Sequence, residues 1–382
     1  MIDFEARLRE IDEKGLTREL FTMPASGGKF SLNGKEYLNF SSNDYLDLAN
    51  DDRIKKASIA AVEKYGAGSG GSRLMCGTLP LHEELEASLA GWLGYEAGIV
   101  FGSGFLANLG VISALARQGD AIFFDRLDHA SLIDGVLASG ALWKRFSHND
   151  MEGLEEMLKK SSGNKFIIVD SVFSMDGDIS PVKKLREISD AYGAFLIVDE
   201  AHAIGVFGSG AGICARDNVR ADLITGTFSK AFGGYGGFAV CSGIIKKVII
   251  NTARPFIFST SPPPACLGGA KMAFDIIMKE KTLGKELLSN SLYFHGLLKQ
   301  AGLKVPEFSS QIIPVMIGEN GDAIKAAARL FEEGVYAKAI RPPTVPKGTA
   351  RLRLSVTLSH SRAALKSAAE KTASAALKAG LI

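Results

Sequence analysis

The chain has 382 residues, of which 46% are hydrophobic, and its formal net charge is +2. This size suits one large domain with a smaller companion, and the balanced charge excludes a strongly basic surface for nucleic acid or anionic membranes. The charged N-terminus is unlike a secretion signal, and no apolar run reaches the roughly 18 residues of a membrane span. The four cysteines have no zinc-ligand spacing. We expect a cytoplasmic globular protein without a metal.

The first fifty residues predict a helix and a hairpin. Phe4, Leu8 and Ile11 recur at helical spacing, which indicates an amphipathic helix over residues 3–20. Residues 29–40 form two short apolar runs around an Asn-Gly pair, the strongest short-range signal for a hairpin. These residues have no place in the alternating pattern that follows, so we expect residues 1–50 to pack with the C-terminal part.

Two glycine-rich stretches compete as phosphate-binding loops. A helix is predicted from Asp51 or Asp52 to Tyr65, and Gly66-x-Gly68-x-x-Gly71 follows it. This pattern resembles a dinucleotide fingerprint, but a helix precedes it instead of a strand, so the signal is weak. Residues 102–107 have the better context, between a predicted strand at 99–101 and a predicted helix at 105–116. The helix start offers free N–H groups to a phosphate of either NAD or pyridoxal phosphate.

Short apolar runs alternate with helical patterns from about residue 98. The runs occupy residues 98–101, 121–124, 166–170, 194–198, 221–225 and 237–241. Continuous apolar strands separated by helices predict a mostly parallel sheet covered on both faces, and ligands of such sheets bind at the carboxyl ends of the strands. We therefore expect a large α/β domain over residues 51–283. Helical patterns and strands alternate differently afterwards, which predicts a small α+β domain over residues 284–382.

One lysine stands on a turn between two of these strands. Residues 225–234 read TGTFSKAFGG, and apolar runs lie on both sides of them. A lysine held on such a turn can form a Schiff base with an aldehyde cofactor, although an isolated lysine is usually a solvated surface residue. Asp199 ends another apolar run, and a buried carboxylate needs a cationic partner such as a protonated pyridine nitrogen. Capping of the next helix or pairing with an arginine are the alternatives for Asp199.

Other polar residues also follow predicted strands. His202 can hydrogen-bond a cofactor hydroxyl and His129 can stack on a ring, but both also fit ordinary loop or helix-start histidines. The hydroxyl of Thr227 suits a phosphate, though hydroxyls are common in turns. Near the C-terminus, alternation places Arg351 and Arg353 on one face of a strand. We expect one arginine to grip a substrate carboxylate and the other to form a surface ion pair.

Together these motifs resemble the α-oxoamine synthases, pyridoxal-phosphate enzymes of fold type I. The resemblance covers nearly the whole chain, on the segments 39–46, 68–73, 125–132, 173–178, 198–202, 227–233 and 340–355. It implies a large domain with a mostly parallel seven-stranded sheet between helices, and a smaller α+β domain. Asp170 stands where some members carry Glu, which we interpret as a tolerated change.

The resemblance also implies roles for individual residues. It assigns cofactor binding to Gly104, Phe105, His129, Ser174, Asp199, His202, Thr227 and Lys230, and substrate binding to Arg18, Asn43, His129, Thr344 and Arg353. Lys230 would hold pyridoxal phosphate and later move a proton, Asp199 would pair with the pyridine nitrogen, and His129 would stack on the ring. These three residues are the expected catalytic set. Members of the family are homodimers, so Ser259 and Thr260 are expected to serve the partner's phosphate.

The implied activity is a decarboxylative condensation of L-alanine with a pimeloyl thioester of CoA or of a carrier protein. The stretch 340–355 favours this member of the family. Siblings that use glycine or serine, such as 2-amino-3-ketobutyrate ligase, are the alternative. An NAD-dependent dehydrogenase built on residues 102–107, with Asp120 or Asp125 near the ribose, and a cofactor-binding protein without activity are weaker alternatives, because they leave Lys230 and Asp199 without a shared task.

Overall fold

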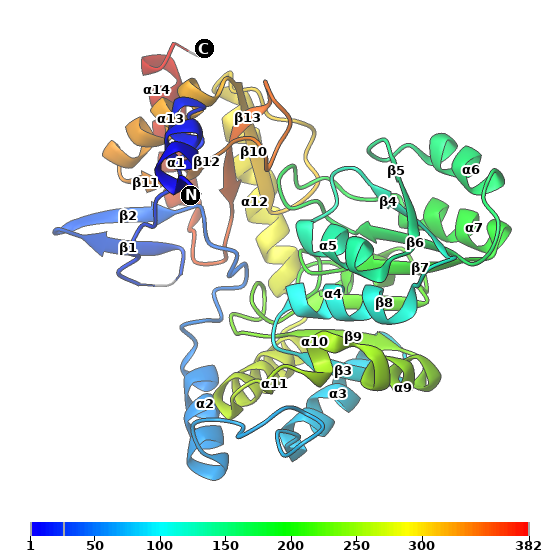
Figure 1. Cartoon of the computed structure of the whole chain (residues 1–382). Coiled ribbons are helices and arrows are strands. Elements are labelled where there is room, and N and C mark those ends of the chain that lie inside the picture. The colour runs from blue at the N-terminus through cyan, green and yellow to red at the C-terminus, as the bar shows by residue number, and fades with distance from the viewer. Residues whose placement is uncertain (1, 26, 381–382) are drawn as a thin grey trace. The chain divides into compact units, whose positions relative to one another are not determined.

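The structure is a computed structural model that describes residues 2–25 and 27–380, and it forms two compact units (Figure 1). The large unit comprises Asp44–Ser174 and Asp178–Lys285. The small unit comprises the chain up to Asn43, Met175–Gly177 and the chain from Glu286 onward. The domain boundaries expected at residues 50 and 283 stay a prediction.

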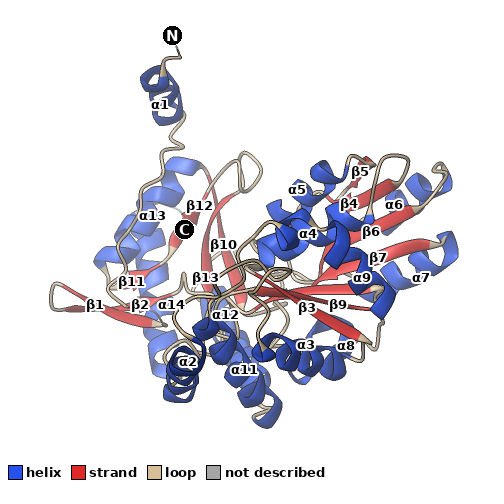
Figure 2. Cartoon of the chain, turned by 60° about the horizontal axis from the view of Figure 1, so that its bottom comes forward, coloured by secondary structure: helices blue, strands red, loops and turns tan. Residues whose placement is uncertain are grey.

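A seven-stranded sheet forms the centre of the large unit, in the order β3-β9-β8-β7-β6-β4-β5 (Figure 2). Its strands are β3 Ala97–Phe101, β4 Ala121–Asp125, β5 Leu142–Phe146, β6 Lys165–Asp170, β7 Ala194–Asp199, β8 Leu223–Thr227 and β9 Gly237–Cys241. Strand β9 is antiparallel to β3 and β8, and the other pairs are parallel. The predicted mostly parallel sheet is therefore confirmed.

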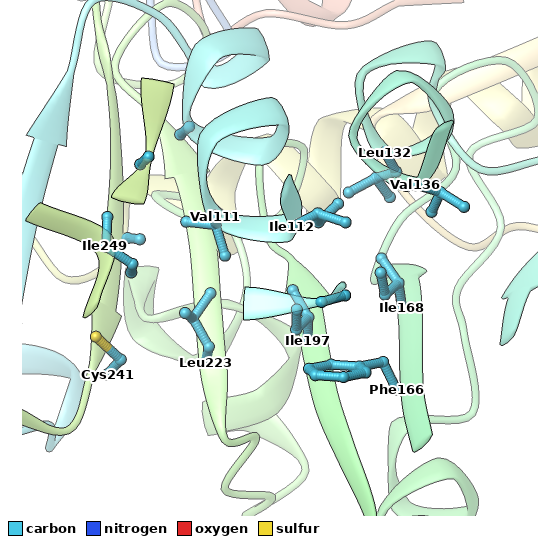
Figure 3. Close-up of a cluster of buried hydrophobic side chains, with 14 of the residues drawn as sticks. Val111, Ile112, Leu132, Val136, Phe166, Ile168, Ile197, Leu223, Cys241 and Ile249 are labelled. Atoms are coloured by element: carbon cyan, nitrogen blue, oxygen red, sulfur yellow. The ribbon is translucent and has the colours of Figure 1, made fainter. Parts of the chain in front are cut away.

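Helices surround this sheet. They are α2 Asp52–Tyr65, α3 Pro80–Leu93, α4 Gly104–Leu115, α5 Ala130–Ser139, α6 Met151–Lys159, α7 Val182–Tyr192, α8 Gly212–Arg216, α9 Gly243–Thr252, α10 Arg254–Ile257 and α11 Pro264–Lys279, with a 3-10 turn at Gly208–Gly210. Figure 3 shows side chains of α4 and α5, such as Val111 and Leu132, packed against strand residues Ile197 and Leu223. Each such burial stabilises the fold by about 1.5–3 kcal/mol. Leu196, which points to the other face, is also buried.

Within the described residues, the small unit holds two three-stranded sheets and four helices. The sheets are β1-β2-β11, with β1 Lys29–Leu32, β2 Lys35–Asn39 and β11 Val335–Tyr336, and β10-β13-β12, with β10 Ile312–Gly318, β12 Lys338–Ile340 and β13 Ala350–Ser355. The helices are α1 Phe4–Glu13, α12 Leu283–Gln300, α13 Asn320–Glu332 and α14 Arg362–Lys378. The predicted hairpin turns at Asn33 and Gly34, which both have positive φ.

Helix α1 is shorter than the helix predicted over residues 3–20. It ends at Glu13 because Gly15 takes a φ of 63°, and the Leu16 N–H bonds back to the Ile11 carbonyl. No residue of α1 is buried. Within the described ranges, none of the helices combines the length and the apolar character of a membrane span.

Candidate active site

Lys230 lies on residues 228–236, the turn that joins β8 to β9. The turn is closed by a hydrogen bond from the Phe228 N–H to the Gly236 carbonyl at 3.0 Å. Gly233 has a φ of 63°, and a Cβ there would lie 2.3 Å from the Ala49 backbone nitrogen, so this position requires glycine. Backbone contacts therefore fix the turn that carries Lys230. The turn lies between two strands, as predicted from the sequence.

Asp199 ends β7 and is 4% exposed. Its Oδ1 accepts a hydrogen bond from the Ala201 N–H at 2.8 Å, and its Oδ2 accepts a hydrogen bond from Asn108 Nδ2 at 2.6 Å. Asn108 in turn accepts the Thr225 hydroxyl at 2.6 Å. Both donors to Asp199 are neutral, so these bonds orient the carboxylate without neutralising its charge. A buried carboxylate held in this way favours a cation beside it.

His129 stands at the start of α5, beside the same carboxylate. The backbone N–H of His129 donates to Asp170 Oδ2 at 2.7 Å. The ring Nδ1 of His129 accepts a hydrogen bond from the backbone N–H of Ser131 at 3.2 Å. Partial burial lowers the pKa of His129, and the positive charge of Lys230 lowers it further, while Asp199 opposes both. The charges of Lys230 and Asp199 thus both act on the His129 imidazole, and hydrogen bonds through Asn108 and Ser131 connect His129 to Asp199.

His202 lies three residues beyond Asp199 and is 4% exposed. Its Nδ1 is 2.7 Å from the hydroxyl of Tyr45, a side chain that is fully buried. This bond fixes the plane of the imidazole. His202 therefore has a rigid orientation near the carboxyl end of β7.

The N-terminus of α4 and the end of β8 lie side by side and form a cradle of groups that can bind a phosphate. The Ser103 hydroxyl caps the helix by accepting the Leu106 N–H. The N–H groups of Gly104 and Phe105 have no intrahelical acceptors, because they belong to the first turn. A Cβ on Gly104 would lie 3.0 Å from Thr227 Cβ, so the two segments are in close contact. Thr227 Oγ1 is also 2.7 Å from the Ser229 hydroxyl. Free N–H groups, a positive helix end and two hydroxyls are the groups that bind a phosphate.

Ser174 lies in a turn that is closed between Phe173 and Asp178, and His148 contacts this turn at Asp178. The Phe173 N–H donates to the Asp178 carbonyl at 3.0 Å. His148 Nε2 lies 2.6 Å from Asp178 Oδ2, and its Nδ1 lies 3.0 Å from Asp125 Oδ1. Burial opposes a charge on His148, but the hydrogen bonds to the two aspartates outweigh it and raise its pKa to about 9. No motif around His148 indicates this pair of contacts.

In the small unit, Arg353 and Asn43 come together. Both terminal nitrogens of Arg353 lie 3.1 Å from Asn43 Oδ1, and one donates to the Ser355 hydroxyl at 2.8 Å. Arg351 instead pairs with Asp176. The side chain of Arg351 is 4% exposed and that of Asp176 is 25% exposed, so the expected surface ion pair is in fact a partly buried one.

Arg18 and Thr344 also come together in the small unit, with Arg18 Nη2 3.3 Å from the Thr344 hydroxyl. Arg18 borders a groove of about 710 Å³. The apolar residues that line this groove are Leu8, Ile11, Leu16 and Pro343. An apolar surface with an arginine at its edge suits an aliphatic chain that ends in an anion.

Residues 35–371 match the family model for aminotransferase class I and II. The chain belongs to this family. Two relatives named 8-amino-7-oxononanoate synthase extend the match over almost all of the chain. The protein of Lysinibacillus sphaericus is 44% identical over 365 residues, which cover 94% of this chain and 93% of that one. The protein of Geobacter sulfurreducens is 43% identical over 383 residues, with 98% of each covered.

Solved structures agree with this family assignment. A serine palmitoyltransferase of S. paucimobilis with bound pyridoxal phosphate is 31% identical, with a TM-score of 0.93 over 99% of this chain and 98% of that one. An 8-amino-7-oxononanoate synthase of Francisella tularensis is 29% identical, with a TM-score of 0.79 over 91% and 99%. The predicted fold type I, pyridoxal-phosphate cofactor and acyltransferase class are thereby confirmed. The dehydrogenase alternative finds no support in these matches.

The side chains of this aminotransferase-family site fit the cofactor. The cradle at Gly104 and Thr227 suits its phosphate, and the negative Asp199 suits a protonated ring nitrogen. His129 keeps an exposed surface on which a ring can lie. Among the residues that the structure describes, there is no group of three or more His, Cys, Asp or Glu side chains placed to hold a metal.

The residues that orient Asp199 and His202 were not predicted from the sequence. Asn108 and Tyr45 supply hydrogen bonds to Asp199 and His202 across 91 and 157 residues of sequence. One signal for Asn108 was present, because an amide inside the apolar helix pattern of residues 105–116 must find partners when buried.

Proposed function

We propose that the chain joins L-alanine to a pimeloyl thioester, of CoA or of a carrier protein, with loss of CO2, to give 8-amino-7-oxononanoate for biotin synthesis. The observation that carries this proposal is that hydrogen bonds through Asn108 and Ser131 connect Asp199 to His129, while the charge of Lys230 acts on the same imidazole. The relatives at 43–44% identity are named for synthesis of the same product, 8-amino-7-oxononanoate, which supports the proposal.

Pyridoxal phosphate supplies, when bound, an electron sink for the negative charge that develops at the alanine Cα. Lys230 would hold the cofactor and then act as the base that removes the Cα proton. Asp199 would keep the ring nitrogen protonated, and His129 would cover the ring face. The Gly104–Phe105 backbone and Thr227 would hold the phosphate.

The remaining cofactor contacts follow the same assignment. His202, oriented by Tyr45, would hydrogen-bond the ring hydroxyl, and Ser174 would lie close to the cofactor. The alanine Cα would then attack the thioester carbonyl carbon while the carbon–sulfur bond breaks and the thiol leaves. Loss of the carboxyl group as CO2 and return of a proton to Cα complete the reaction.

Substrate binding is assigned to the small unit. Arg353, with Asn43 beside it, would bind the alanine carboxylate through its planar guanidinium. Arg18 and Thr344 would contact the acyl substrate, whose aliphatic chain suits the groove beside Arg18. An Arg18→Ala variant should therefore raise the KM for pimeloyl-CoA about tenfold and leave the KM for alanine unchanged.

We also propose a homodimer in which each copy contributes to the other's site. Ser259 is half-buried, and Thr260 is exposed and forms a β-bridge with Ser72. These hydroxyls are the ones expected to reach the partner's phosphate. Analytical ultracentrifugation tests the dimer, and Thr260→Val should weaken cofactor binding if the hydroxyl is shared.

The decisive experiment combines Lys230→Ala with a comparison of amino acids. The variant should lose turnover and should carry no cofactor after borohydride reduction, as judged by mass spectrometry, whereas the wild type should carry one per chain. Full activity of the variant would refute the proposal. Rates with alanine, glycine and serine separate the sibling activities. The serine enzyme is the second candidate, because solved serine palmitoyltransferases match with a TM-score of 0.93.

A further inference from the structure

A chain of hydrogen bonds joins Asp199 to His129 through Asn108 and Ser131. Asn108 is 2% exposed in α4, and its Nδ2 donates to Asp199 Oδ2 at 2.6 Å and to Ser131 Oγ at 2.9 Å. Its Oδ1 accepts the Thr225 hydroxyl at 2.6 Å. Ser131 Oγ lies 2.8 Å from His129 Nδ1. The amide of Asn108 thus uses both protons and its oxygen within this chain.

The direction of each bond follows from the one before it. An ionised carboxylate only accepts, so Asn108 must turn its NH2 group to Asp199 and its oxygen to Thr225. The second proton of that NH2 group points at the Ser131 oxygen. Ser131 therefore accepts from Asn108 and has its own proton left to donate to His129 Nδ1.

His129 Nδ1 then has no room for a proton of its own. It accepts from the Ser131 hydroxyl at 2.8 Å and from the Ser131 N–H at 3.2 Å. A neutral imidazole carries one proton, which must lie on the other nitrogen when Nδ1 accepts. The ring therefore has a single N–H donor, at Nε2.

We propose that Asn108 and Ser131 are positioning residues that couple Asp199 to His129 and fix His129 as the tautomer protonated on Nε2. The inference deepens the proposed function, since it rests on the roles given there to Asp199 and His129. His129 then presents an N–H donor to an oxygen of the substrate, and the same carboxylate that serves the cofactor ring sets the direction of that donor.

The charges around His129 are consistent with a neutral ring. Partial burial and the charge of Lys230 lower its pKa, while Asp199 and Asp134 raise it. Asp170 faces the backbone N–H of His129 and not its ring nitrogens. The tautomer is therefore the property that the hydrogen-bond chain can set near neutral pH.

The test is nitrogen NMR of the cofactor-free protein labelled with 15N-histidine. The chain has six histidines, so the spectrum contains few signals. A His129→Gln variant identifies the signals. The wild type should show His129 protonated on Nε2 at pH 7. Ser131→Ala should give a mixture of tautomers and raise the pKa of His129 by about half a unit to one unit, since a donor to Nδ1 is lost. Asn108→Ala should move the signals in the same direction.

Ser113→Ala is the matched control, because its hydroxyl bonds to the Leu109 carbonyl in the same helix, away from this chain of bonds. It should leave the His129 signals unchanged. A wild-type ring protonated on Nδ1, or Ser131→Ala signals and titration identical to the wild type, would overturn the inference. If Asn108→Ala does not fold, Ser131→Ala alone decides. Because no cofactor is present, the outcome is independent of the Lys230→Ala experiment, which tests the proposed function.

Discussion

Replacing Gly237 by alanine tests whether the start of α4 holds the cofactor phosphate. Gly237 begins β9 and pairs with Phe101 and Thr227. An added Cβ would lie 2.4 Å from the Ser103 carbonyl oxygen and 2.5 Å from the Gly104 nitrogen. Because ordinary contacts begin at 3.4 Å, β9 and the start of α4 must move apart by about 1 Å.

Two effects of different size follow from this displacement. Overpacking of a buried site costs about 1–3 kcal/mol, and each kcal/mol lowers the Tm of a unit of about 150–250 residues by about 2–4 °C. If the proposed assignment holds, the displaced Gly104 N–H would also lose its bond to the phosphate. A hydrogen bond to a charged group contributes about 1.5–3 kcal/mol, so the Kd for pyridoxal phosphate should rise about 10- to 100-fold.

Gly98→Ala is the control, because it crowds the same sheet elsewhere. Gly98 lies in β3, and a Cβ on it would lie 2.5 Å from the carbonyl oxygen of Glu86 in α3. Calorimetry of the cofactor-free proteins should show similar losses of Tm in both variants, and absorbance titration should show a weaker Kd only for Gly237→Ala. Equal values of Kd in the two variants would refute the assignment of the phosphate to Gly104 and Phe105.

Three further predictions address other parts of the molecule. Arg353→Lys should raise the KM for alanine about tenfold, since an ammonium cannot bind a carboxylate at two points as a guanidinium does. The control Arg351→Lys should change this KM by less than about twofold, as measured by steady-state kinetics. The raised pKa of His148 stabilises the folded chain by up to about 3 kcal/mol below pH 6.5, and this contribution disappears as the pH rises through about 9. Urea unfolding should therefore separate the wild type from His148→Gln at pH 6 but not at pH 9.5. Glu200→Ala strands the N–H groups of Ile213 and Cys214 and should cost about 3 kcal/mol in unfolding free energy without changing the cofactor Kd.

The elements that carry the reactive residues were predictable because their signals are local. The strand, turn and strand around Lys230 and the strand that ends at Asp199 each follow from a short apolar run with polar residues after it. Parallel strands place their carboxyl ends at one edge, so the grouping of these residues followed from topology alone. The roles of the individual residues stay predictions.

The residues that orient this set were not predictable, because their bonds connect distant segments. Nothing near Asn108 in the sequence indicates that it bonds to Asp199 and Thr225, which are brought beside it only by the folded sheet. The end of α1 was wrong for a related reason. The helix was expected to run to residue 20, but the backbone conformation of Gly15 ends it earlier.

The antiparallel direction of β9 within the seven-stranded sheet explains why the lysine can be held so firmly. A parallel strand after β8 would need a crossover of a dozen or more residues back to the opposite edge of the sheet. Because β9 runs antiparallel to β8, it begins at the edge where β8 ends, and residues 228–236 suffice to join them. Lys230 therefore stays at the carboxyl edge, on a turn closed between Phe228 and Gly236. The same reversal brings Gly237 against the start of α4, so one strand direction fixes both the lysine turn and the cradle proposed for the phosphate.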